Sequence, residues 1–287
     1  MQFLLILLLC LIATVKMVAQ SRFGKHNVKT MTDVALLDVG VFLIASLLFS
    51  YRLPSATGMC WLFAVIFGVF SATYQLFYTR ALATGPVSLV GLIVNLAMPI
   101  CVTFSAIAYD EPITPLRAIG ILLVLVSFFF SVERGGKKPS GGKGWIFYAF
   151  ITMLANGACA IVQKIYVKTA GEAADGQTFT ACCYLAATML CLLFFAVMQL
   201  RKSRLSYRID KRFLGCVVLL GLLLGGFQAI NTYAMSVIVG TLFFPGYYGT
   251  SIILSTLAGV LVCKDKLKPR QIAAILIGTV AVVLVNL

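Results

Sequence analysis

The stretch FYTRALATGPVSLVGLIVNLAMPICVTFSAIAYDEPITPLRAIGILLVLVSFF, residues 77–129, decides the fold of this chain. A tight Gly-Pro connector leads into a long apolar run, an acidic residue and a Pro follow, and a second apolar run closes the stretch. An α-helix needs roughly 20 mostly apolar residues to cross a bilayer. The strands of a membrane barrel are only about ten residues long and alternate in polarity. The stretch therefore predicts membrane-spanning helices.

Apolar runs of this kind recur along the whole chain. Of the 287 residues, 61% are hydrophobic and 11% are charged, and the mean hydropathy is +1.02. Soluble domains average about 45–50% apolar and about 25% charged residues. No long hydrophilic block is left for a soluble domain. We expect an all-α membrane protein with ten transmembrane helices, at residues 1–20, 32–51, 58–79, 84–108, 115–132, 144–167, 178–200, 213–233, 238–262 and 270–287. The first run lacks a basic start and a suitable cleavage site, so it is interpreted as a helix and not as a signal peptide.

An internal repeat divides the chain into two units. The Gly- and Lys-rich stretch at 131–145 is typical of a solvated connection, and we expect repeats at 1–135 and 144–287 with a basic linker at 136–143. An offset of 154 residues aligns Glu111 with Asp265 and Pro115 with Pro269. Because five is an odd number of helices, the second copy enters the membrane from the opposite side. Such inverted repeats are typical of secondary transporters.

The quoted stretch, together with LLFSYRLPSATGMCWLFAVIFGVF at 47–70, resembles the EamA-type repeat of the drug/metabolite transporter (DMT) superfamily. The end of the chain, GYYGTSIILSTLAGVLVCKDKLKPRQIAAILIGTVAVVLVNL at 246–287, resembles a second copy. The resemblance implies a DMT/EamA fold whose helices one, three, four, six, eight and nine line a central cavity. The chain departs from the family pattern where Cys263, Lys264 and Asp265 replace the usual Gly-Glu after the ninth helix. The aromatic residue that the family often has in its first helix is also missing.

Basic residues indicate an orientation. Most Lys and Arg residues lie in the connectors after helices one, three, five, seven and nine. The positive-inside rule then places both termini outside, whereas the resemblance implies termini in the cytoplasm. Either this chain is inverted relative to its relatives or the helix count differs by one. We expect a multi-pass protein of the bacterial cytoplasmic membrane.

Uncharged residues are the best candidates for a substrate cavity. Gly and Pro interrupt two helices at matching positions of the repeats, which is the best pointer in a sequence to a midplane site. Polar and aromatic residues on other helices would face these positions, although Asn and Gln side chains also bond between helices without any ligand. The predicted cavity residues are Tyr74, Gln75, Tyr78, Gly91, Asn95, Pro99, Asn156, Gln163, Gln228, Asn231, Tyr247 and Tyr248.

Charged residues within the spans are few, and such residues are costly enough to suggest function. Lys16 and Asp38 lie at a similar depth in the first two helices, so we expect either a structural pair or a role in gating or proton coupling. Arg80 is a candidate for the cavity mouth or for a contact with lipid headgroups. Lys164 lies at the corresponding place in the sixth helix, but its long side chain can reach the interface, so a structural role is favoured over a functional one.

Several functions are excluded or disfavoured. The basic residues form no continuous face beside aromatics, so no nucleic-acid partner is expected. The nine Cys are scattered without CxxC spacing and the one His, His26, lies in a connector, so we expect neither a metal nor a cofactor. The chain lacks a GxxxxGK[ST] loop for ATP and the clustered groups that an enzyme needs.

We therefore expect a secondary transporter that works by alternating access, exporting amino acids, other small metabolites or amphipathic compounds. Protons are a candidate coupling ion, and the protein would be a monomer or homodimer in the bilayer. The alternatives are a lipid-handling or non-transporting membrane partner and, less favoured, an intramembrane enzyme. The near-neutral cavity suggests zwitterionic, aromatic or weakly cationic solutes.

Overall fold

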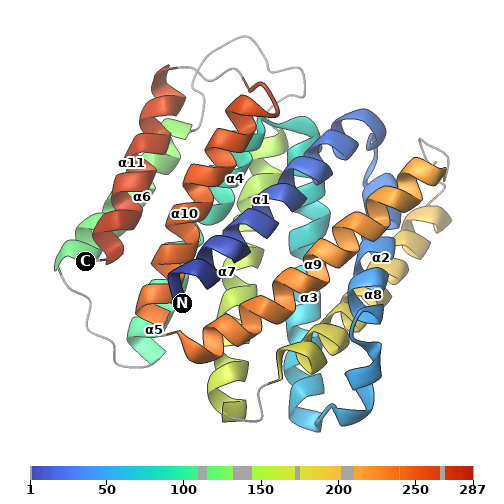
Figure 1. The fold of residues 1–287 in the computed structure, drawn as a ribbon. Coiled ribbons are helices and arrows are strands. Elements are labelled where there is room, and N and C mark those ends of the chain that lie inside the picture. Colours follow the sequence, from blue (N-terminus) through green and yellow to red (C-terminus); the bar gives the residue numbers. More distant parts are fainter. Residues whose placement is uncertain are drawn as a thin grey trace.

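The computed structural model describes residues 2–108, 115–131, 144–171, 175–201, 210–238, 240–265 and 269–286. The described residues form helices and no strand (Figure 1). The long helices lie side by side, and a separate pair, α6 and α11, flanks α10 at one edge. The elements are α1 (Gln2–Asn27), α2 (Met31–Leu47), the 3-10 helix η1 (Ser50–Ser55), α3 (Gly58–Thr84), α4 (Val87–Asn95), α5 (Met98–Ala108), α6 (Pro115–Ser131), α7 (Gly144–Ala170), α8 (Gly176–Leu200), α9 (Lys211–Val237), α10 (Gly240–Leu261) and α11 (Pro269–Asn286).

Six helical segments of the described chain are long and apolar enough to cross a membrane: Gln2–Asn27, Gly58–Thr84, Val87–Phe104, Gly144–Ala170, Gly176–Leu200 and Lys211–Val237. Shorter apolar helices lie at Gly246–Leu261 and Ile272–Ala281. Each of the ten predicted runs contains helix, which confirms an all-helical membrane protein. The count of ten spans and their inverted arrangement go beyond these observations. The predicted linker at 136–143 lies outside the described residues.

The fourth predicted helix is broken into α4 and α5. Leu96 and Ala97 form a turn, and the helix resumes at Met98. Pro99 has no N–H, so it cannot donate to the carbonyl of Asn95 four residues earlier. The break therefore lies where the sequence predicted an interruption. Its counterpart in the second repeat differs, because α10 runs without a break past Pro245.

Polar side chains cap the helix ends. Thr30 and Asp33 form a capping box at the start of α2, and Asp175 and Asp210 accept backbone N–H groups at the starts of α8 and α9. The first four N–H groups of a helix have no partner within it, and these carboxylates and hydroxyls satisfy some of them. The caps fix where α2, α8 and α9 begin.

Small residues bring α9 against α2. A Cβ built on Gly221 would lie 2.6 Å from the Cβ of Ile44 and 2.9 Å from the carbonyl oxygen of Val41. A Cβ on Gly225 would lie 3.1 Å from the carbonyl oxygen of Ala45. Only glycine permits such a close approach of two helix backbones. The GxxxG sequence formed by Gly221 and Gly225 is therefore a packing motif within the chain.

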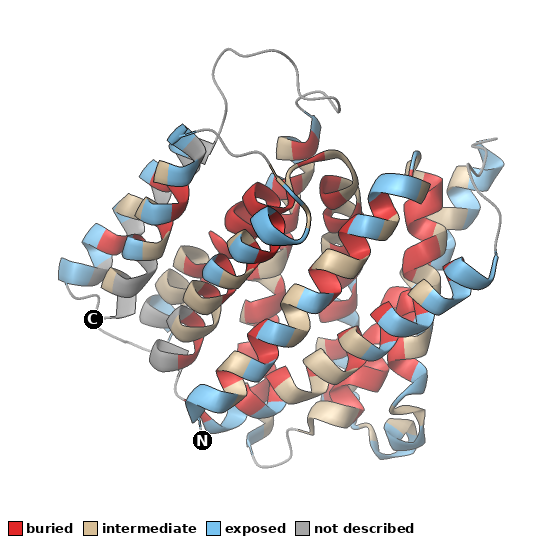
Figure 2. Cartoon of the chain, turned by 45° about the horizontal axis from the view of Figure 1, so that its top comes forward, coloured by how far each residue is buried: buried red, intermediate tan, exposed pale blue. Residues whose placement is uncertain are grey.

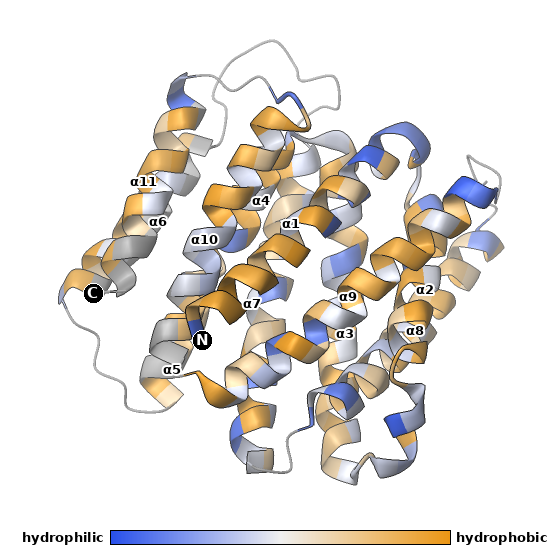
Figure 3. Cartoon of the chain, in the orientation of Figure 1, coloured by the Kyte–Doolittle hydropathy of each residue, from blue (hydrophilic) through white to orange (hydrophobic). Residues whose placement is uncertain are grey.

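Burial and hydropathy describe a lipid-facing bundle. Buried residues lie on the faces that the helices turn to one another (Figure 2). Large apolar side chains such as Leu62, Leu193 and Leu276 are exposed. Hydrophobic residues cover the lengths of the helices and hydrophilic residues gather at their ends (Figure 3). An apolar exterior of this extent suits lipid as the surrounding medium.

Candidate functional site

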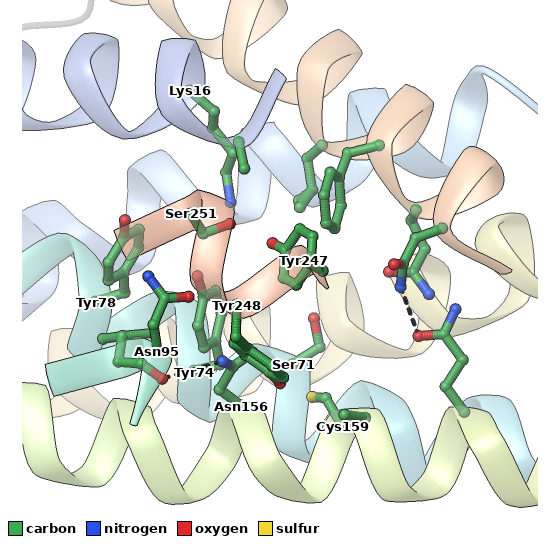
Figure 4. A pocket seen from close by; sticks show the side chains of 18 of the residues that line it. Lys16, Ser71, Tyr74, Tyr78, Asn95, Asn156, Cys159, Tyr247, Tyr248 and Ser251 are labelled. Carbon is green, nitrogen blue, oxygen red and sulfur yellow. Dashed lines mark hydrogen bonds between the residues drawn. The ribbon is translucent and has the colours of Figure 1, made fainter. Parts of the chain in front are cut away.

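A cavity of about 130 Å³ lies within the bundle, lined by residues of α1, α3, α4, α7, α8, α9 and α10. Figure 4 shows Lys16 reaching from its helix toward a space bordered by Tyr74, Tyr247, Tyr248 and Ser251. Ten of the twelve predicted cavity residues line this space: Tyr74, Tyr78, Gly91, Asn95, Asn156, Gln163, Gln228, Asn231, Tyr247 and Tyr248. The sequence thus predicted the position of a cavity, and its use by a substrate stays a prediction.

Two predicted cavity residues lie elsewhere. Gln75 is fully buried behind the wall, where its Oε1 accepts a hydrogen bond from the Nζ of Lys16 at 3.0 Å. Pro99 is half-buried beyond the α4–α5 break and is not in the lining. Pro99 lies outside the lining because the chain turns after Asn95 and α5 leads away from the cavity.

Aromatic rings form much of the wall. Tyr74 and Tyr78 stack at 5.2 Å on α3. Tyr247 lies edge-on to Tyr248 at 5.3 Å and parallel to Phe243 at 6.0 Å on α10. Rings in such contacts are held rigidly and offer flat apolar surface with polar edges. The wall therefore suits a small solute with an aromatic or apolar part.

Amide side chains hold the cavity helices together. The Nδ2 of Asn231 donates to the Oε1 of Gln163 at 2.9 Å, and the Nε2 of Gln163 donates to Thr232 at 2.7 Å. Asn156 donates to the carbonyl oxygen of Val94 at 3.2 Å. These bonds join α7 to α9 and α7 to α4. The amides act as interhelical bonds and line the cavity at the same time.

Lys16 is the charged residue of the described lining. Its side chain is 7% exposed, and its Nζ lies 5.7 Å from the ring centre of Tyr74 and 6.0 Å from that of Tyr78. Gln75 is the one hydrogen-bond acceptor that it contacts in the described part of the chain. An ammonium group has three donors. Two N–H groups of Lys16 thus have no hydrogen-bond acceptor in the described chain.

Asp38 is also buried, but it does not form a direct ion pair with Lys16. The hydroxyl of Thr79 lies 3.3 Å from Asp38 Oδ1 and 2.9 Å from the backbone carbonyl of Gln75. The Oδ2 of Asp38 has no hydrogen-bond partner. Lys16 and Asp38 are therefore connected through side chains of α3. The structure replaces the predicted direct pair by a hydrogen-bond network in which Gln75 and Thr79 link the two charged residues.

The other charged candidates lie away from the cavity. Arg80 donates to the carbonyl oxygen of Val28 at 3.5 Å and does not line the space. Lys164 is buried, with its Nζ 5.5 Å from the ring centre of Phe244, so the expectation that it reaches the interface is wrong. The repeat partner of Asp265, Glu111, lies outside the described residues.

Asp265 joins the two halves at one end of the bundle. Its Oδ2 accepts the backbone N–H of Ser88 at 2.9 Å and the Ser88 hydroxyl at 3.0 Å. Lys25, at the end of α1, lies 3.8 Å from its Oδ1. The carboxylate therefore caps the start of α4, in the other half of the chain.

Sequence reasoning missed several lining residues. Phe67 and Ser71 lie two turns and one turn before Tyr74 on the same face of α3, and Ser251 and Ser255 follow Tyr247 at helical spacing on α10. Helical periodicity from the predicted residues would have found these positions. The missed lining residues are Ala13, Thr14, Met17, Phe67, Ser71, Val94, Cys159, Ala160, Tyr184, Leu224, Phe227, Met235, Phe243, Phe244, Ser251 and Ser255.

Comparison with known proteins agrees with this architecture. Residues 1–132 match the EamA-like transporter family. The resemblance to EamA-type transporters of the DMT superfamily is thereby confirmed. Members of this family are membrane transporters and not enzymes.

No curated protein matches the chain. Among solved structures, 28 chains match, including one described only as the crystal structure of a protein. That structure is 22% identical, covers 96% of this chain and 94% of its own, and superposes with a TM-score of 0.60. At this identity the likeness concerns the fold alone. It extends over both halves of the chain, beyond the region of the family match.

Proposed function

We propose that this chain is a secondary transporter of ten spanning helices, in which two inverted EamA-like repeats alternate access to the central cavity. The observation that carries the proposal is a buried cavity lined by polar and aromatic residues from both halves, in a chain whose first half matches a transporter family. Transporters of inverted repeats bind their substrates between the repeats.

The helix contacts support the repeat. Under the proposed repeat, the elements α1, α2, α3, α4–α5 and α6 correspond in this order to α7, α8, α9, α10 and α11. If each helix is replaced by its counterpart, the main helix–helix contacts are converted into other contacts that are also present. The contact of α1 with α9 becomes that of α7 with α3, and α2 with α9 becomes α8 with α3. The pairs α2–α8, α4–α10 and α6–α11 map onto themselves. A twofold relation between the halves produces this pattern.

The polar network at Lys16 supports a role for protons. A carboxylate buried in the membrane is costly and is typical of a proton relay. Asp38 is completely buried and keeps one oxygen without a hydrogen-bond partner. We propose that Asp38 carries the coupling proton and that Lys16 senses both the proton and the solute. Arg80, held by the carbonyl oxygen of Val28, would act only as an anchor for the turn before α2.

The basic end of the bundle supports an orientation. Lys25 pairs with Asp265 and Arg22 donates to the carbonyl oxygen of Val262 at 3.4 Å, so the connectors after α1 and α10 meet at one end. We propose that this end faces the cytoplasm of a bacterial plasma membrane, with both termini outside. A reporter fused to the carboxyl terminus, active only outside the cell, tests this orientation.

Solute flux into liposomes that contain the purified protein tests the function, with amino acids and other small metabolites as the solutes. We propose that the protein is a monomer or a homodimer in the bilayer. The thiol of Cys159 borders the cavity, so a variant that keeps only this cysteine should lose flux after alkylation with a bulky reagent. A cysteine-free variant is the matched control and should keep its flux. Lipid scrambling without solute flux would support the lipid-handling alternative and refute the proposal.

A further inference from the structure

Positive and negative groups are placed differently relative to the cavity. The described lining holds one ammonium group, that of Lys16, and no carboxylate. Asp38 lies behind the wall, and it contacts Thr79 and not the cavity. A solute in the cavity therefore meets the positive charge directly, while the carboxylate of Asp38 lies outside the lining and is linked to Lys16 through Thr79 and Gln75. A cationic solute would meet no carboxylate at all.

Lys16 and Gln228 of the lining keep donors without acceptors, and within the described chain the side-chain oxygens of Asn95, Asn156 and Asn231 accept no hydrogen bond. Lys16 keeps two N–H groups beyond its bond to Gln75. Gln228, another lining residue, accepts from the Tyr184 hydroxyl at 3.4 Å, but its buried Nε2 has no acceptor. Buried donors without acceptors are costly, and a ligand that brings acceptors would satisfy them. Because Lys16 is the charged member of this set, an anionic group with acceptor oxygens would satisfy the donors best, while the amide oxygens can accept from neutral donors of the same solute.

The dimensions limit the solute. An engineered apolar cavity of about 150 Å³ binds benzene, and this cavity measures about 130 Å³. Its walls near Lys16 are the rings of Tyr74, Tyr78 and Tyr247. A flat or apolar body of about one ring fits the space between these side chains.

We propose that the cavity binds compact monocarboxylates, with the carboxylate on Lys16 and an aromatic or apolar body against the tyrosine wall. This inference rests on the proposed function and names the chemical class of its substrate. It replaces the sequence-based preference for weakly cationic solutes, because the carboxylate that would attract a cation is outside the cavity.

Three probes of nearly the same shape test the proposal: benzoate, benzamide and benzamidine, which are anionic, neutral and cationic. Binding to the purified full-length protein is measured by calorimetry. Benzoate should bind at least about tenfold more tightly than benzamide, since a hydrogen bond to a charged group in a buried site contributes that much. Benzamidine should bind most weakly. Equal or tighter binding of benzamide or benzamidine overturns the proposal.

Substitutions test whether Lys16 causes the preference for benzoate. Lys16→Gln should abolish the preference for benzoate over benzamide, and Lys29→Gln is the matched control because Lys29 is exposed outside the cavity. Removing Lys16 leaves Asp38 as an uncompensated buried charge, which destabilises a fold. The double variant with Asp38→Asn removes both charges, so it should fold and show the same loss. A preference for benzoate that survives in the double variant overturns the assignment to Lys16.

Different results would refute the carboxylate assignment and the transport function. If another solute crosses the liposome membrane and benzoate neither binds nor competes, the protein is a transporter and the carboxylate assignment is wrong. If no solute crosses and none binds, the transport function itself is refuted. Benzoate binding that Lys16→Gln abolishes, together with inhibition of solute flux by benzoate, supports both.

Discussion

Gly221→Ala tests the close packing of α9 against α2, which belong to different halves of the chain. The added Cβ would lie 2.6 Å from the Cβ of Ile44, 2.7 Å from its Cγ2 and 2.9 Å from the carbonyl oxygen of Val41. Two of these atoms cannot move without the α2 backbone, so α9 must move away. Overpacking of this kind costs about 1–3 kcal/mol, whereas replacing Gly by Ala within a helix alone stabilises by about 0.5–1 kcal/mol.

Gly226→Ala is the matched control, because its Cβ would meet nothing within 4 Å on the same helix. The two variants should therefore differ by roughly 1–3 kcal/mol, which corresponds to at least about 3 °C in the unfolding midpoint. A thiol-reactive fluorogenic dye measures the midpoint, since seven of the nine free cysteines are buried and react on unfolding. If Gly221→Ala is as stable as Gly226→Ala, the close packing of α2 on α9 is wrong.

Three other substitutions test the polar groups. Asp265→Asn should lower the unfolding midpoint, because the cap on Ser88 and the pairing with Lys25 weaken by about 0.5–2 kcal/mol; unchanged stability would contradict the cap. Lys264→Gly should raise the midpoint, since Lys264 has a φ of 55° and a non-Gly residue there costs about 1–2 kcal/mol; a lower midpoint would contradict the strain. Asp38→Asn should remove the dependence of liposome flux on an imposed pH gradient while solute exchange continues; flux that still follows the gradient would exclude Asp38 as the proton carrier.

Most of the fold was predictable because its signal is local. Apolar runs of spanning length located each helix, and Pro99 located the break between α4 and α5. The family pattern has Gly-Glu where this chain has Lys264-Asp265, and the structure gives Lys264 the positive φ that favours glycine. A family pattern thus identified a backbone constraint even where this sequence departs from it.

The site was predictable only in part, because its contacts depend on helix rotation. Lys16 and Asp38 were assigned a similar depth, but depth does not reveal that Gln75 of α3 lies between them. The cap of Asp265 on Ser88 joins residues 177 positions apart, and no local spacing predicts it. Pairings between distant helices were the part of the site that the sequence did not determine.

The two repeats provide equivalent positions that now differ in chemistry. Lys16 of α1 and Lys164 of α7 correspond under the proposed repeat, but Lys16 lines the cavity while Lys164 is outside the lining, with its Nζ 5.5 Å from the ring centre of Phe244, a residue of that lining. A symmetric scaffold with two equal ammonium groups would bind a monocarboxylate in either of two orientations. With only Lys16 in the described lining, the carboxylate has one favoured position and the apolar body lies against the tyrosine wall. The asymmetry thus predicts that the bound solute keeps one orientation throughout the transport cycle.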